Sequence, residues 1–157
     1  MKKLLIIGIV IMGFTTSSYA QDIAKNALGI RVGDSDGFGT EISYQARLND
    51  NNRLEFDLGW RSGNKYDGYK LAALYQWVHK LDGRFNWYVG AGGGLGSYES
   101  KKDNNEETFL FAAGDLGIEY NLNIPLLISL DFRPELGFGD FRDDVDLDIA
   151  LSIRYQF

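Results

Sequence analysis

Apolar and polar side chains alternate along residues 145–157, the last thirteen of the chain. One parity carries Val145, Leu147, Ile149, Leu151, Ile153, Tyr155 and Phe157, and the other carries Asp146, Asp148, Ala150, Ser152, Arg154 and Gln156. Because successive side chains of a β-strand point to opposite faces, this pattern predicts a strand with one apolar face and one polar face.

The same period-two pattern recurs in seven earlier segments, separated by clusters of Gly, Asn, Asp and Ser. The eight predicted strands cover residues 26–33, 38–48, 53–62, 68–79, 84–97, 108–121, 126–138 and 145–157. Most of these segments are about ten residues or longer, which is the length that a tilted strand needs to cross a bilayer. We therefore expect an all-β fold, an eight-stranded antiparallel up-and-down transmembrane β-barrel.

The predicted connections alternate in length. Residues 49–52, 81–84 and 121–125 form tight turns, whereas 33–37, 62–67, 97–107 and 139–144 are mostly longer and more polar. Short turns at one end and longer loops at the other are typical of outer-membrane barrels, in which the turns face the periplasm.

The predicted lipid face is apolar and has aromatic residues near both ends. The third strand places Leu54, Phe56, Leu58 and Trp60 on this face, and the seventh places Leu126, Ile128, Leu130, Phe132, Leu136 and Phe138 there. The turn-side aromatic belt contains Tyr75, Trp77, Phe85, Trp87, Tyr120, Tyr155 and Phe157, and the loop-side belt contains Phe38, Trp60, Tyr69 and Phe138. Alternation alone does not say which face is inside, so a soluble lipocalin-like carrier of a hydrophobic ligand remains an alternative.

Residues 1–20 have the pattern of a secretory signal peptide. Lys2 and Lys3 precede an apolar run from Leu4 to Phe14, and Ser18-Tyr19-Ala20 forms a plausible cleavage site before Gln21. The expected domains are thus a signal peptide, 1–20, and an outer-membrane barrel, 21–157, exported to the cell outer membrane. The chain has no Cys, which excludes disulfides and thiolate chemistry.

The net charge of the chain is −6. A nucleic-acid-binding protein needs a basic face to neutralise phosphates, so this balance speaks against nucleic acid as a partner.

The segment 59–96, GWRSGNKYDGYKLAALYQWVHKLDGRFNWYVGAGGGLG, contains a Leu-Tyr-x-Trp strand, a short turn and a Trp-Tyr-x-Gly-x-Gly strand. It resembles the compact outer-membrane β-barrel proteins of Bacteroidetes-like bacteria, and the whole chain resembles the OmpA transmembrane-domain and OmpX type. The resemblance implies that Tyr155 and Phe157 belong to an assembly signal for the barrel-assembly machinery. It further implies contact with outer-membrane lipid and lipopolysaccharide and a monomeric state.

Charged residues recur on the polar face of the predicted strands. They are Arg31, Glu41, Arg47, Glu55, Asp57, Lys70, Asp115, Glu119, Asp131, Arg133, Glu135, Asp146, Asp148 and Arg154. Lone charges in a narrow lumen are costly, so we expect paired charges that plug the barrel. A proton or ion path is the alternative, although eight strands leave no continuous water channel.

Two other features suggest chemistry, but neither matches a known motif. The run 90–96 is glycine-rich but lacks the spacing of a phosphate-binding loop, and its glycines instead leave room in the lumen for large side chains opposite. His79 is the only histidine, and a lipid A-modifying enzyme would pair it with a Ser such as Ser62, Ser97, Ser100 or Ser129.

The loops carry many charges: Glu99, Lys101, Lys102, Asp103, Glu106, Glu107, Asp140, Arg142, Asp143 and Asp144. Their spacing matches no EF-hand, and we expect mostly solvated loops, with bridging of lipopolysaccharide through divalent cations as the alternative. The sequence thus predicts a non-enzymatic envelope barrel with a structural or surface-interaction role, no catalytic residues, no cofactor and no metal.

Overall fold

The computed structural model describes residues 23–33, 39–62, 66–102, 106–138 and 145–157. These residues form eight strands: β1 (Asn26–Val32), β2 (Thr40–Arg47), β3 (Asn52–Ser62), β4 (Tyr66–Asp82), β5 (Phe85–Ser100), β6 (Glu106–Asn121), β7 (Leu126–Phe138) and β8 (Val145–Gln156). The predicted signal peptide and Phe38 lie outside the described residues.

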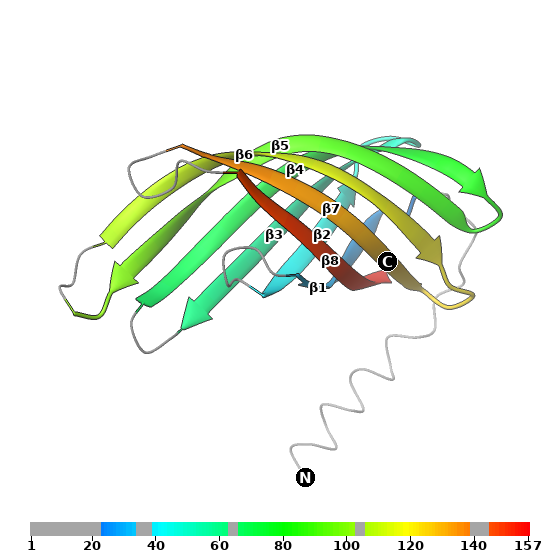
Figure 1. Cartoon of the computed structure of the whole chain (residues 1–157). Helices are drawn as coiled ribbons and strands as arrows, with labels where there is room; N and C mark the ends of the chain where they lie inside the picture. Colours follow the sequence, from blue (N-terminus) through cyan, green and yellow to red (C-terminus); the bar gives the residue numbers. More distant parts are fainter. Residues whose placement is uncertain (1–22, 34–38, 63–65, 103–105, 139–144) are drawn as a thin grey trace, which may run out of the picture.

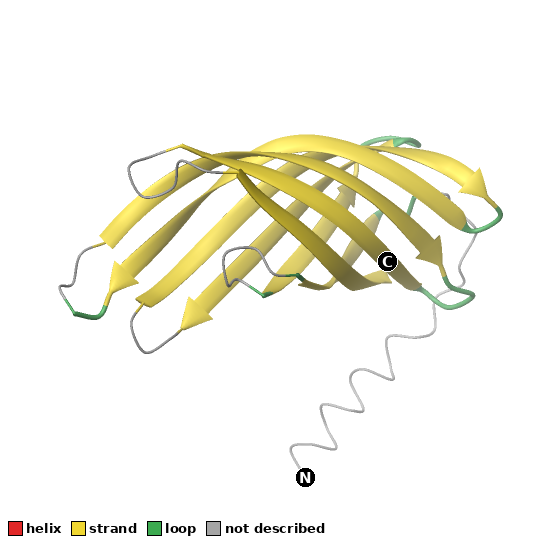
Figure 2. Cartoon of the chain, in the orientation of Figure 1, coloured by secondary structure: helices red, strands yellow, loops and turns green. Residues whose placement is uncertain are grey.

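The strands form one closed antiparallel barrel in sequence order, in which β8 pairs back to β1 (Figure 1). Ala27 pairs with Gln156 and Val32 with Leu151 across this seam. Closure gives every strand two neighbours and leaves no edge. Strands and short connections account for all of the described fold (Figure 2). The eight-stranded barrel prediction is confirmed. Within the described residues, no helix has the length and apolarity to cross a membrane.

The two ends of the barrel differ. The connections after β2, β4 and β6 are short and lie at the end where the chain terminates, which we call the turn end (Figure 1). Gly83, in the turn after β4, has a φ of 54°, a left-handed conformation that favours glycine. The opposite end, which we call the loop end, carries the other connections. There β5 ends at Ser100 and β6 begins at Glu106, so the connection between them is shorter than the predicted loop 97–107.

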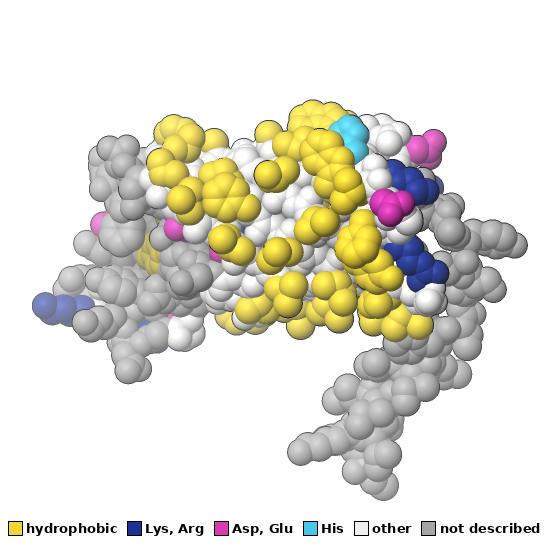
Figure 3. All heavy atoms as spheres, turned by 45° about the vertical axis from the view of Figure 1, so that its right-hand side comes forward, with side chains coloured by type: hydrophobic (Ala, Val, Ile, Leu, Met, Phe, Trp, Pro, Cys, Tyr) yellow, Lys and Arg dark blue, Asp and Glu magenta, His cyan; other side chains and the backbone are white. Residues whose placement is uncertain are grey.

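The apolar face of the strands points outward and the charged face points inward. On β8, Leu147, Ile149, Leu151 and Ile153 are exposed, whereas Asp148 and Arg154 are buried. Hydrophobic side chains accordingly cover the wall of the barrel, and charged side chains appear toward its ends (Figure 3). This arrangement is the reverse of a soluble lipocalin-like barrel, so that alternative is wrong for this fold.

A proline interrupts the ladder between β6 and β7. Ala113 pairs with Glu135 and Leu116 with Phe132, but Gly114 and Asp115 have no paired residue on β7. Pro134 lies opposite Gly114 in this register, and proline has no N–H to donate to the neighbouring strand. The wall therefore lacks a ladder hydrogen bond at this position.

Candidate functional site: the lumen ion-pair network

The barrel interior holds thirteen buried charged side chains among the described residues. Arg31, Arg53, Lys70, Arg133 and Arg154 are basic, and Glu41, Glu55, Asp57, Asp115, Glu119, Asp131, Glu135 and Asp148 are acidic. We call this set the lumen network. Its members come from every strand except β5, because each strand turns every second residue inward.

Arg31, on β1, joins four strands. Its Nη1 donates to Asp148 Oδ2 at 2.6 Å and to Glu41 Oε2 at 3.1 Å. Its Nε and Nη2 donate to Asp131 Oδ1 at 3.0 and 2.5 Å. The planar guanidinium thus contacts three carboxylates, from β2, β7 and β8, in a geometry that lysine cannot supply.

Arg133, on β7, reaches across the lumen to the opposite wall. Its Nη2 donates to Asp57 Oδ2 at 2.5 Å and to Glu55 Oε1 at 3.2 Å, both on β3. Its Nη1 donates to Glu41 Oε2 at 3.3 Å, the same oxygen that Arg31 contacts. Glu41 therefore links the two guanidinium groups into one network.

Amide and hydroxyl side chains complete the middle of the network. Gln76 Nε2 donates to Asp115 Oδ2 at 2.5 Å and to Glu55 Oε2 at 3.2 Å. Arg154 forms an ion pair with Glu55, with Nη2 at 3.2 Å from Oε2. Its Nε and Nη1 also donate to Ser43 and Ser129, at 2.9 and 2.8 Å. These bonds satisfy groups that would be expensive to bury alone.

Toward the turn end, Arg53 is the main cation. Its Nη1 lies 2.8 Å from Glu119 Oε2, and its Nε donates to Gln76 Oε1 at 2.5 Å. The guanidinium carbon lies 4.8 Å from the ring centroid of Tyr88, which is fully buried. This is the geometry of a cation–π contact. Asn86 Nδ2 donates to Glu119 Oε1 at 3.1 Å.

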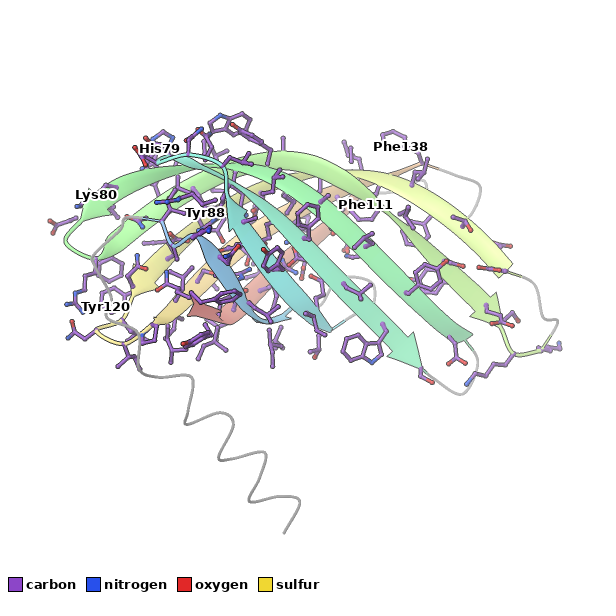
Figure 4. All side chains as sticks on the ribbon, turned by 180° about the vertical axis from the view of Figure 1, so that it is seen from behind. His79, Lys80, Tyr88, Phe111, Tyr120 and Phe138 are labelled. Atoms are coloured by element: carbon purple, nitrogen blue, oxygen red, sulfur yellow. The ribbon has the colours of Figure 1, made fainter. Side chains whose placement is uncertain are left out.

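Toward the loop end, the network meets aromatic side chains. Lys70 Nζ donates to Glu135 Oε1 at 2.9 Å and lies 5.4 Å from the ring centroid of Phe111. Phe111 packs in an apolar cluster with Ala72, Leu74, Phe109 and Ala113. A second apolar cluster, Ile23, Val78 and Tyr88, lies on the turn side. Figure 4 shows Tyr88 and Phe111 toward opposite ends of the barrel interior. An apolar cluster thus lies toward each end of the lumen network, and we call the two clusters the loop-side cap and the turn-side cap.

Glycines on β5 and β6 make room for these aromatic rings. A Cβ on Gly96 would overlap the ring of Phe109, one on Gly94 the ring of Phe111, and one on Gly117 the ring of Tyr88. The expectation that the glycine run accommodates large side chains opposite is therefore correct for Phe109 and Phe111.

The structure brings twelve of the fourteen charged residues that the sequence analysis placed on the polar face into the lumen network, all except Arg47 and Asp146. Arg47 is half-buried at the turn-end rim, where its Nη1 donates to the carbonyl of Ile23 at 3.4 Å. Asp146 is half-buried opposite Glu135 on β7. The sequence analysis did not include Arg53. Its parity on β3, shared with Glu55 and Asp57, was the signal that could have identified it.

His79 lies outside the lumen. Its ring stacks on that of Trp87, with centroids 4.6 Å apart, and Figure 4 places it near the turn end. Ser62 and Ser97 lie near the loop end, where Ser97 Oγ bonds Glu106, and Ser129 is bonded to Arg154 inside the lumen. The structure therefore does not bring His79 together with these serines. Within the described residues, no group of three or more His, Cys, Asp or Glu is placed to hold a metal ion.

No family model matches this sequence, and no curated protein matches it. Solved structures with a similar fold do exist. The N-terminal β-barrel domain of Pseudomonas aeruginosa OprF aligns with a TM-score of 0.69 at 13% identity, covering 84% of this chain and 96% of that domain. Neisserial surface protein A aligns with a TM-score of 0.59 at 15% identity, covering 84% and 94%.

The attachment invasion locus protein Ail of Yersinia pestis aligns with a TM-score of 0.57 at 16% identity, covering 84% of this chain and 96% of Ail. A second structure of Ail, with the heparin analogue sucrose octasulfate, aligns with a TM-score of 0.56. Identities at this level establish the fold alone. The chain thus has the fold of the small eight-stranded outer-membrane barrels.

Proposed function

We propose that this protein is a non-enzymatic barrel of the bacterial outer membrane whose lumen is closed by ion pairs. Its role is structural or interactive at the envelope surface. The observation that supports this proposal is the inverted arrangement of the wall, with charges inside and large apolar side chains outside. Such a wall is stable where lipid surrounds it, since a closed barrel satisfies its backbone internally.

Fractionation tests the location. We expect the protein in the outer-membrane fraction, with a gel mobility that changes on boiling because the closed barrel resists detergent at room temperature. A protein recovered from the soluble periplasmic fraction, with one mobility in both conditions, would overturn the proposal.

The enclosed lumen network supports a role without conductance. Each arginine of the lumen network contacts at least one carboxylate, and an apolar cluster lies toward each end. We expect no stable channel in planar bilayers. Steady single-channel currents from the purified protein would contradict the closed lumen while leaving the membrane location intact.

The C-terminal strand supports contact with the barrel-assembly machinery. Phe157 exchanges two backbone hydrogen bonds with Asn26, each 2.9 Å, and its ring is exposed and stacked with Tyr155. Its side chain is thus available at the turn end of the outer wall. Deletion of Phe157 should lower the amount of protein in the outer membrane, whereas Leu48→Ala, an exposed turn substitution, should not.

The loop end does not favour a polyanion like the one bound to Ail. Its exposed charges include Glu99, Glu106 and Glu107 against Lys101 and Lys102, and Lys101 Nζ lies 3.0 Å from Asp67. The remaining loop sequence adds Asp34, Asp36, Asp103, Asp140, Asp143 and Asp144 against Lys65 and Arg142. A surface partner at this end would instead be cationic or bridged by divalent cations, as for lipopolysaccharide phosphates.

Calorimetric titration with sucrose octasulfate tests this charge argument. We expect no saturable binding to the native protein, and binding only after the triple change Glu99→Lys, Glu106→Lys and Glu107→Lys. Saturable binding to the native protein would show that the acidic rim does not set partner choice.

A further inference from the structure

The turn-side cap of the lumen contains one residue that belongs to no strand. Ile23 precedes β1, yet it is only 5% exposed, and it packs against Val78 and Tyr88. Val78 points into the barrel like Gln76, two residues before it on β4. Tyr88 likewise points inward, like Asn86 two residues before it on β5. Ile23 therefore occupies the turn-end mouth of the barrel interior rather than its outer wall.

Hydrogen bonds to Arg47 and Phe157 fix the segment 23–25 and the residue after it in this position. Arg47, at the end of β2, donates from its Nη1 to the carbonyl of Ile23 at 3.4 Å. Its backbone N donates to the carbonyl of Lys25 at 2.9 Å. Asn26 then enters the barrel wall through its backbone bond to Phe157. The segment is thus tied to the rim through Arg47, while Lys25 itself is exposed.

Tyr88 packs in the same cluster as Ile23 and lies beside the turn-side ion pair of the lumen network. It is fully buried and stacks on Arg53, which pairs with Glu119. Its hydroxyl has no hydrogen-bond partner among the described residues. Ile23 therefore covers a buried tyrosine at the turn side of the lumen network.

The caps at the two ends differ in how they are held. Phe109 and Phe111 of the loop-side cap are part of β6 and pair with residues of β5 along a continuous ladder. Displacing them requires breaking the wall. Ile23 can leave its seat while every ladder bond of the barrel stays intact, because it lies outside all strands.

We propose that residues 23–25 form a strap that closes the turn-end mouth of the barrel. The side chain of Ile23, which we call the stopper, fills the mouth, and Arg47 holds the strap in place through its hydrogen bonds. Release of the strap opens the turn side of the lumen to water and small cations as far as Tyr88, without opening the loop end. The proposal rests on the closed lumen argued above. The predicted cleavage before Gln21 lies two residues from Ile23 and would give the strap a free end.

The absence of cysteine from the chain allows a direct test by single-cysteine labelling. The probe is a small cationic methanethiosulfonate reagent, applied to the purified, detergent-solubilised barrel. Val78→Cys places a thiol behind the stopper. We expect Ile23→Gly to speed its labelling about tenfold, as for a buried group exposed by local opening. Lys25→Gly, in the same segment but at an exposed residue, should leave the rate unchanged.

A thiol deep in the lumen separates failure of the strap from failure of the closed lumen. Ser152→Cys is a near-isosteric change at a buried position between β1 and β7. It should stay protected both in the native background and with Ile23→Gly. Rapid labelling of Ser152→Cys in the native background would contradict the closed lumen. An unchanged rate at Val78→Cys with Ile23→Gly would overturn the strap alone.

A second measurement needs no disruptive change. Ile23→Cys should label about tenfold more slowly than Lys25→Cys in otherwise native chains, because one side chain is seated and the other is exposed. Arg47→Ala should abolish most of that difference, since it removes the side-chain anchor. Equal rates for the two cysteines in the native chain would overturn the proposal.

Discussion

Arg31 and Asp131 are separated by 100 residues in the chain, yet Arg31 holds Asp131 through two nitrogen atoms, with Nη2 2.5 Å and Nε 3.0 Å from Oδ1. Both side chains are buried. The contact joins β1 to β7 through the interior, although these strands are not neighbours in the wall. The lumen network thus ties together strands that no backbone hydrogen bond connects.

The first prediction concerns this cross-barrel contact. Arg31→Ala leaves Glu41, Asp131 and Asp148 buried without their shared cation, and should lower the free energy of unfolding by about 3–5 kcal/mol. Urea unfolding in lipid vesicles measures this change. Arg84→Ala, at an exposed turn residue, is the control and should cost less than about 0.5 kcal/mol. Equal losses at both sites would contradict a stabilising role for the network.

The second prediction tests the depth of the lipid face. Leu151 and Leu81 are each 58% exposed, but Leu151 lies within β8 and Leu81 next to the turn after β4. Leu151→Arg should cost about 2–4 kcal/mol in vesicles, whereas Leu81→Arg should cost about 0–1 kcal/mol, because the penalty for a charge falls toward the interface. If the barrel did not span lipid, the two substitutions would lower the free energy of unfolding by similar amounts.

The third prediction concerns Gly96 and Phe109. A methyl group on Gly96 would overlap the ring of Phe109, so Gly96→Ala should destabilise the barrel by about 1–3 kcal/mol through overpacking. Phe109→Leu should relieve part of this loss, giving a positive coupling in a double-mutant cycle. Gly39→Ala is the matched control, since its Cβ would meet only a carbonyl at 3.4 Å. Additive losses at Gly96 and Phe109 would show that the ring does not need the glycine.

The fourth prediction concerns the interrupted ladder. Pro134→Ala supplies the N–H that is missing opposite Gly114, and should raise the free energy of unfolding by about 1 kcal/mol. Amide exchange should show a new, slowly exchanging proton at residue 134. Pro125→Ala, in the turn before β7, adds no ladder bond and should not stabilise the barrel. Fast exchange at residue 134 would mean that the two strands are separated for another reason.

Alternation along the chain was sufficient to predict all eight strands to within a few residues at most ends. It also predicted which residues share a face, as with Glu55 and Asp57 on β3. These features depend on backbone geometry and on neighbours close in sequence. The sequence analysis did not include Arg53 in the network, although Arg53 lies on the same face of β3 as Glu55 and Asp57. Alternation places a residue on the polar face but does not say which residues of that face form ion pairs.

The sequence by itself determined the strands, their order and the two chemically different faces, since each follows from the two-residue repeat of an extended chain. Only the tertiary structure decided that the charged face lies inside, because either face can line a closed sheet. It also decided which charges meet, as with Arg31 and Asp131, and that Ile23 covers the turn-end mouth. These contacts depend on barrel closure and strand register, which bring together residues that are distant along the chain.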